Sequence, residues 1–177
     1  MLVNALNGGA GRGRPLGCFL SAAPPPPANS LPRSVLYRLL VREVAAFQGH
    51  AAQLDAQGKA SNFVSRYHQT LFHLDDLQAA QLIEIVIPCA QQVKALDDQA
   101  STIIQHAKAN YGKLHGVPVP PPPAALADLE ARRTAVVLAA ADSIAAAFGP
   151  AEFASFELLV QKHFGSRHTA PGGASGN

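Results

Sequence analysis

Histidine is the residue type that most suggests a chemical role, because the chain has seven histidines in 177 residues. Neutral imidazole binds zinc, copper and nickel, so a metal site is the first hypothesis. His68 and His73 are five residues apart, as are His163 and His168, and this spacing puts the two side chains on different helix faces. We therefore expect surface or half-buried histidines and assign no metal ligand. His68, His106 and His163 could share a site only if the topology brought their helices together.

The sequence contains no recognisable catalytic constellation. Serine, histidine and aspartate occur, but there is no Gly-x-Ser-x-Gly elbow, no His-Glu-x-x-His pair, no phosphate-binding glycine loop and no nucleotide fingerprint. The glycine-rich residues 8–13 follow no strand pattern and open no helix. Asp75–Asp76 and Asp97–Asp98 are adjacent pairs that diverge around a helix, so neither pair can flank one substrate. We expect no catalytic residue, no cofactor and no enzymatic activity.

Two chemically distinctive side chains fall on apolar helix faces. Arg133 lies between Leu129 and Val136, so either its charged end extends past its neighbours to water or it pairs with an acidic group on another helix. Cys89 lies on an apolar stripe, whereas Cys18 lies in a Pro- and Gly-rich end segment. We expect Cys89 to be a buried free thiol rather than half of a disulfide.

Composition excludes several kinds of partner. The formal net charge is +2, without any run of Lys and Arg, and Trp is absent, so we expect no nucleic acid partner. No run of about 18 apolar residues occurs, so we expect no integral membrane segment. Arg12 and Arg14 precede a short apolar stretch at residues 16–23, which has the order of a secretory signal but too short an apolar part. A periplasmic or secreted location is therefore a hypothesis, and a cytoplasmic location stays open.

The domain organisation follows from proline, glycine and apolar periodicity. Residues 1–32 and 165–177 bury too little apolar surface to order themselves, so we expect disordered ends around one helical domain at residues 33–164. The first helix is expected from about Ser34 to Gln57, where Gly58 ends it. Its apolar residues recur at alternating steps of three and four, as in a coiled coil. This seam consists of Tyr37, Leu40, Val44, Phe47, Ala51 and Leu54.

The other helices follow from the same periodicity. We expect a short helix at about 61–72, a long one at 76–111, another at 124–148 and a last one at 150–164, separated by a Pro-rich linker at 117–123. The 76–111 helix is apolar almost all round near Ile83 and Ile87, so it should be enclosed there and two-faced beyond Lys94. Pro88 should bend it. No segment alternates as a strand does, so the sequence predicts an all-α bundle of three long and two short helices.

A capping box opens the 76–111 helix. The carboxylate of Asp75 can accept a hydrogen bond from the amide of Gln78, whose side chain can reach back to the amide of Asp75. The stretch Leu74-Asp75-Asp76-Leu77-Gln78 resembles the Leu-Thr-x-x-Gln motif of the periplasmic Spy/CpxP-like proteins, with Asp75 in place of the threonine. Residues 148–152, Phe-Gly-Pro-Ala-Glu, occupy the comparable place before the last helix.

The resemblance implies an all-helical protein, often dimeric, of a family that includes chaperones and envelope-stress or metal-responsive proteins. Residues 34–164 also resemble a group of uncharacterised exported bacterial helical proteins. We therefore expect a non-enzymatic binding protein of the bacterial envelope, chaperone-like or stress-related. A metal-binding or metal-sensing protein and a cytoplasmic interaction module are the alternatives. The expected partner is a second copy in a weak dimer or an amphipathic protein client.

One apolar patch lies away from the predicted seams. Val35 and Leu39 are roughly opposite the seam of the first helix, beside Arg38 and Arg42. Either the Pro-rich lead-in or a short helix covers them, or they form a surface for a second subunit or a client. We expect the protein itself to cover them.

Overall fold

The structure, a computed structural model, describes residues 31–111 and 121–168. Every element of regular secondary structure in these ranges is an α-helix. The all-α class predicted from the sequence is confirmed. The six helices in these ranges are α1 (Arg33–Ala56), α2 (Asn62–Ser65), α3 (Tyr67–Leu71), α4 (Asp76–Tyr111), α5 (Ala124–Phe148) and α6 (Pro150–His168).

Two predicted boundaries differ from the structure. The single short helix expected at 61–72 is divided into α2 and α3 by a turn at Arg66, whose φ of −95° and ψ of 1° leave the helical region. The last helix ends at His168 rather than near Phe164, because Phe164 still packs in the core and holds the following turn. Residues 1–30, 112–120 and 169–177 lie outside the described ranges, so the disorder expected at both ends stays a prediction.

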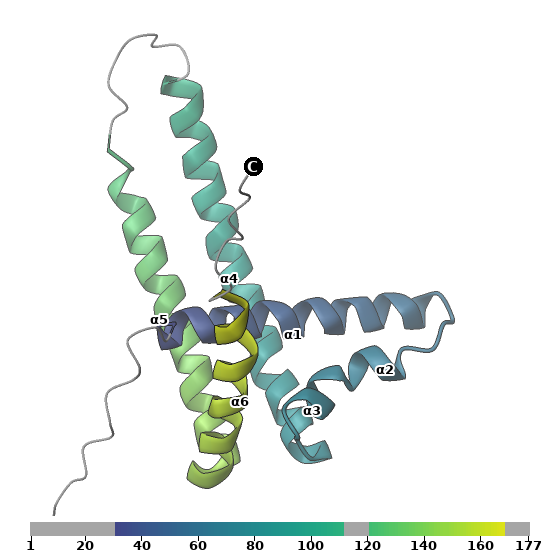
Figure 1. The fold of residues 1–177 in the computed structure, drawn as a ribbon. Helices are drawn as coiled ribbons and strands as arrows, with labels where there is room; N and C mark the ends of the chain where they lie inside the picture. Colours follow the sequence, from purple (N-terminus) through teal and green to yellow (C-terminus); the bar gives the residue numbers. More distant parts are fainter. Residues whose placement is uncertain (1–30, 112–120, 169–177) are drawn as a thin grey trace, which may run out of the picture.

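The helices cross rather than run as one parallel bundle. Figure 1 shows α4 and α5 as an antiparallel hairpin, with α6 beside the lower half of α5 and α1 lying across both. Below the far end of α1, α2 and α3 lead back to the start of α4. The upper halves of α4 and α5 extend past α1 as a two-helix arm. Helix α1 therefore crosses α4, α5 and α6, and side chains from distant parts of the chain meet at these crossings.

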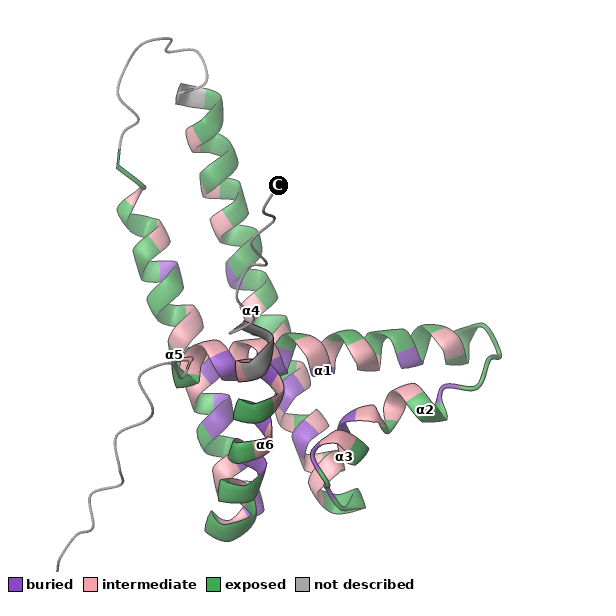
Figure 2. Ribbon diagram, in the orientation of Figure 1, coloured by how far each residue is buried: buried purple, intermediate pink, exposed green. Residues whose placement is uncertain are grey.

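The core lies where α1 crosses the other three long helices (Figure 2). Tyr37, Leu40 and Val44 of the predicted α1 seam have no exposed surface, and Leu36 and Val41 beside the seam are buried as well. The buried face of α1 is wider than a coiled-coil seam because α1 packs against α4, α5 and α6 together. The other helices contribute mainly Leu82, Val86, Cys89, Val137, Ala141, Ile144, Phe156 and Val160.

Helix α4 changes character along its length, but its first third is not enclosed on all sides as predicted, because Leu77, Glu84 and Pro88 are exposed. Leu82 and Val86 are fully buried where α1 and α5 enclose the helix, whereas Leu96 is the last buried residue toward the arm. Pro88 does not interrupt α4, and both Pro88 and Glu84 are exposed. The bend expected at Pro88 stays a prediction.

The C-terminal end of α5 differs from the prediction made from its apolar spacing. The sequence pattern places Ala147 on the buried face, but Ala147 is exposed and Phe148 is buried in its place. The buried face of α5 turns toward Phe148 because Phe148 packs edge-to-face on Phe156 of α6, with ring centroids 5.2 Å apart. Gly149 follows with a φ of 79°, which lets the chain reverse directly into α6.

The capping box at the start of α4 is confirmed. The Gln78 amide donates to Oδ1 of Asp75 at 2.7 Å, and the Asp75 amide donates to Oε1 of Gln78 at 3.1 Å. Two amides that have no partner within the helix are therefore satisfied reciprocally.

Asp75→Ala should lower the free energy of unfolding by about 0.5–2 kcal/mol, because the Gln78 amide loses its acceptor. Urea denaturation followed by circular dichroism measures the change. Asp98→Ala is the matched control, since Asp98 lies in the middle of the same helix in an exposed pair with Lys94. Equal denaturation midpoints for the two variants would contradict the capping contribution.

Candidate binding groove between α1 and α4

An open groove with a volume of about 870 Å³ lies between α1 and α4. Small side chains on both helices, such as Ala45 and Ala90, keep the helices from filling the space between them. A β-carbon added at Gly49 would meet nothing within 4 Å, so the α1 wall is open at that end. The apolar lining consists of Leu39, Val41, Ala45, Ile87, Ala90 and Val93.

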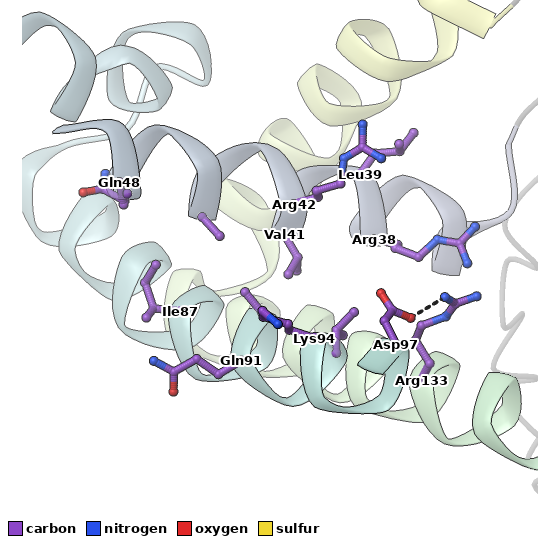
Figure 3. Close-up of a pocket in the computed structure, with 14 residues that line it drawn as sticks. Arg38, Leu39, Val41, Arg42, Gln48, Ile87, Gln91, Lys94, Asp97 and Arg133 are labelled. Atoms are coloured by element: carbon purple, nitrogen blue, oxygen red, sulfur yellow. Dashed lines mark hydrogen bonds and ion pairs between the residues drawn. The ribbon is translucent and has the colours of Figure 1, made fainter. Parts of the chain in front are cut away.

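The rim of the groove is cationic. Arg38 and Arg42 come from α1, Lys94 from α4 and Arg133 from α5, whereas Asp97 is the only acidic side chain among the described residues that line the groove. Figure 3 shows the groove extending along α1 from Gln48 at one end to Arg38 and the Asp97–Arg133 pair at the other. The groove therefore combines an apolar floor with a positive rim.

Arg133 pairs with acidic groups rather than extending to water. Its Nη1 donates to Oδ1 of Asp97 on α4 at 2.7 Å, and its Nη2 donates to Glu130 on α5. The side chain is only 25% exposed. Burial lowers the pKa of Arg133, but the bond to Asp97 and the charge of Glu130 outweigh it, so the net pKa lies above the ordinary value. Of the two sequence-based alternatives, the ion pair between helices is the correct one, and it closes one end of the groove.

The other three cations are less constrained. Arg42 forms no ion pair with any acidic side chain in the described part of the chain. Arg38 contacts Glu130 at 3.3 Å, and Lys94 contacts Asp98 at 2.7 Å, but both pairs are exposed. Exposed ion pairs contribute only about 0–1 kcal/mol, so these cations can exchange partners readily.

Two apolar residues that fall off the predicted seams, Leu39 and Ile87, line this groove. Ile87 is half-buried, yet among the described residues it belongs neither to the main core nor to the side chains packed against it. Leu39 packs on the core and also lines the groove. The protein therefore covers Leu39 on one side only, which corrects the expectation that it is covered fully. Val35 lies apart, in a small cavity of about 40 Å³ beside Arg38 and Arg133.

A second cluster joins α1, α3 and α6. His163 Nε2 lies 3.0 Å from Oε1 of Glu43, and His68 Nε2 lies 3.6 Å from the same oxygen. The carboxylate can only accept, so His163 donates its Nε2 proton. The sequence spacing gave no reason to bring His68 and His163 together. The structure does so because α3 and α6 pack on the same part of α1, whereas His106 lies exposed on the α4 arm.

His68 is unusual because neither ring nitrogen has a hydrogen-bond partner among the described residues, although the residue is 4% exposed. It packs in an aromatic group, with its ring centroid 5.0 Å from Phe47, 5.1 Å from Tyr67 and 6.0 Å from Phe72. Burial lowers the pKa of His68, and Glu43 offsets this only in part. His68 is therefore neutral at pH 7, and its 3.6 Å approach to Glu43 is not a charge pair.

The remaining candidate residues do not form a site. In the described ranges no group of three or more His, Cys, Asp or Glu side chains is placed to hold a metal ion. His73 is exposed, and the side chain of His168 lies outside the described part. Cys89 is a free, buried thiol, as expected, and burial raises its pKa; Cys18 lies outside the described residues. None of the described helices is long and apolar enough to cross a membrane.

The α1–α4 groove combines an open hollow with apolar surface and positive charge, so it is the candidate site. The sequence indicated Leu39 and Ile87 as misplaced apolar residues but gave no sign that they face one another. Comparison with protein families, curated proteins and solved structures finds no match to this chain.

Proposed function

We propose that the chain is a non-enzymatic binding protein that holds the apolar face of an amphipathic partner in the α1–α4 groove. The supporting observation is an open groove of about 870 Å³ with an apolar floor and a cationic rim. Its volume is in the range of established ligand sites. Ile87 supplies a half-buried apolar side chain that the core does not use, which is expected of a side chain that serves a partner.

A chaperone-like role in the bacterial envelope belongs to the same proposal. It rests on the resemblance of residues 74–78 to the Leu-Thr-x-x-Gln motif and on the ability of an apolar groove to shield exposed apolar side chains of a client. The location is tested with a fusion of the whole gene product to a reporter that is active only outside the cytoplasm. A fusion that is expressed but shows no reporter activity would contradict the envelope location and leave the binding proposal in place.

Ile87→Asn should weaken binding of the neutral apolar dye Nile red by about tenfold or more. Full burial of an isoleucine contributes about 1.5–3 kcal/mol, and each 1.4 kcal/mol is tenfold in affinity. Dye fluorescence titration measures the change. In the same proteins, light scattering of a chemically unfolded client tests whether protection against aggregation falls in parallel.

Ile104→Asn is the matched control, because Ile104 lies on the same helix, is 40% exposed and is outside the groove. It should bind dye and protect the client as the unmodified protein does. Circular dichroism checks that both variants stay folded. Equal loss in both variants, or no dye binding by the unmodified protein, would contradict the proposed function.

A further inference from the structure

We infer that the partner held in the α1–α4 groove is an acidic amphipathic helix, with its apolar face on the groove floor and its carboxylates opposite Arg38, Arg42 and Lys94. The inference rests on the proposed function and specifies the chemistry of the partner at the same site.

The walls of the groove favour a helical partner. Both walls lie within long α-helices, whose backbone amides and carbonyls are already bonded within each helix. An extended peptide would find no sheet edge to pair with, so the partner must satisfy its own backbone groups and be recognised by its side chains. The α1 wall from Arg38 to Gly49 is about 16 Å long, which is about three turns of a helix. A partner helix could therefore place apolar residues at positions i, i+4, i+7 and i+11 along the floor.

The open side of the groove also favours a helix over a small amphiphile. Sites for small ligands bury most of the ligand surface in a concave pocket. The α1–α4 groove is open to solvent, so a single acyl chain would keep much of its apolar surface in water. An amphipathic helix matches such a groove better, because it turns its polar face to solvent.

The rim determines the charge of the partner. Arg42 has no acidic partner in the described part of the chain, and the pairs of Arg38 and Lys94 are exposed and weak. Asp97, the only acidic side chain among the described lining residues, is already bonded to Arg133 at 2.7 Å. The unpaired charge around the apolar floor is therefore positive, which attracts carboxylates and repels basic helices.

The chain itself supplies no such partner from its undescribed segments. Residues 1–30, 112–120 and 169–177 contain no Asp or Glu, and residues 1–30 carry Arg12 and Arg14. None of these segments matches the charge of the rim. None of these three segments is therefore the acidic helix of the inference.

The test uses the full chain and two synthetic helical peptides. Both carry leucine at positions i, i+4, i+7 and i+11, and they differ only in Glu or Lys on the polar face. Fluorescence anisotropy should show the Glu peptide binding at least about tenfold more tightly at low ionic strength, because three rim cations each contribute a fraction of a kcal/mol or more. The preference should shrink at about 0.5 M salt, where exposed charges are screened.

Variants assign the preference to the rim. Arg42→Gln and Lys94→Gln should each reduce the preference for the Glu peptide over the Lys peptide severalfold. Arg132→Gln is the control, because Arg132 is exposed on α5 and lies outside the groove; it should keep the full preference.

Each contrary result has a distinct meaning. Equal binding of the two peptides with normal Nile red binding would overturn the acidic helix and leave the proposed function standing, whereas failure of dye and peptides together would overturn both. Tighter binding of dodecanoate than of the Glu peptide would identify a small anionic amphiphile instead. A dimer of the unmodified protein that dissociates with Ile87→Asn would identify a second copy as the occupant. Either of these results overturns the inference.

Discussion

Phe156→Ala is expected to lower the free energy of unfolding by about 3–5 kcal/mol, the usual cost of removing a buried phenylalanine ring. Phe156 is 2% exposed and lies where three parts of the fold meet. Its ring centroid is 5.3 Å from Phe72, 5.2 Å from Phe148 and 6.4 Å from Phe153. Alanine would leave a cavity between these rings, because the crossing helices cannot close together over it.

The loss would be a large part of the stability of a small domain, which is about 5–15 kcal/mol. Urea denaturation followed by circular dichroism measures it. Phe63→Ala is the matched control, because Phe63 is 82% exposed, and its effect should stay within about 0.5 kcal/mol. Similar midpoints for the two variants would show that α6 does not contribute to the core as the structure describes.

Most helix boundaries could be predicted, because they depend on neighbouring residues. Asp75 and Gln78 form the capping box through side chains that are three residues apart, and the structure contains both bonds. Gly58 and Gly149 adopt φ values of 67° and 79°, which few other residues tolerate, so each marks the end of a helix. Helix ends of this kind can be predicted from the local sequence without knowledge of the tertiary fold.

The crossing of α1 over the other helices could not be predicted. The seam of α1 alternates by three and four residues, and this pattern is typical of a partner lying nearly parallel. In the structure α1 instead contacts α4, α5 and α6, so Leu36 and Val41 are buried beside the seam. Periodicity shows which face of a helix is buried, but the direction of the partner depends on how side chains from several helices fit together.

Part of the groove could be predicted from the sequence. Ile87 and Leu39 stand off their seams, and Arg38 and Arg42 flank Leu39, so an apolar patch beside positive charge could be predicted for α1. Ile87 of α4 lies on the opposite wall of the groove, and Arg133 of α5 lies at its end. Both positions result from the way the helices cross, which the sequence does not show. Some of the residues that line the groove could thus be predicted from the sequence, whereas their arrangement around it could be seen only in the structure.

The cluster of Glu43, His68 and His163 was missed for the same reason. Its members are far apart in the sequence, on α1, α3 and α6. One signal was present: Glu43 lies directly beside Val44 on the edge of the buried α1 seam, where an acidic side chain needs a polar partner. The sequence did not show that the partner would be His163, at 3.0 Å.

Acid should destabilise the protein through His68 before most carboxylates titrate. Because burial lowers the pKa of His68 in the folded protein, the unfolded chain takes up this proton at a higher pH than the folded protein does. The free energy of unfolding should therefore rise with pH. The contribution of His68 is fully present above the unfolded pKa of about 6.5 and is lost progressively as the pH falls toward the lower folded pKa. One proton gives a slope of at most about 1.4 kcal/mol per pH unit.

His68→Phe removes the titration and keeps a ring against Phe47, Tyr67 and Phe72. Urea denaturation between about pH 5 and 8 should give a smaller slope for this variant than for the unmodified protein, whatever the difference in absolute stability. His50→Gln is the control, because His50 is exposed on α1 and should leave the slope unchanged. If His68→Phe and the unmodified protein had the same slope, His68 would not be the group that senses acid.

Glu43→Gln tests whether the Glu43 carboxylate acts on the pKa of His68. Glu43 raises the pKa of His68 against the larger effect of burial, so without the carboxylate the folded pKa should fall further. The loss of stability should then continue to lower pH than in the unmodified protein, although the glutamine oxygen can still accept the proton of His163. A loss that ended at higher pH would mean that the Glu43 charge does not act on His68. Because the carboxylate acts on the pKa of His68, Glu43→Gln should change the pH dependence little once His68 is already phenylalanine.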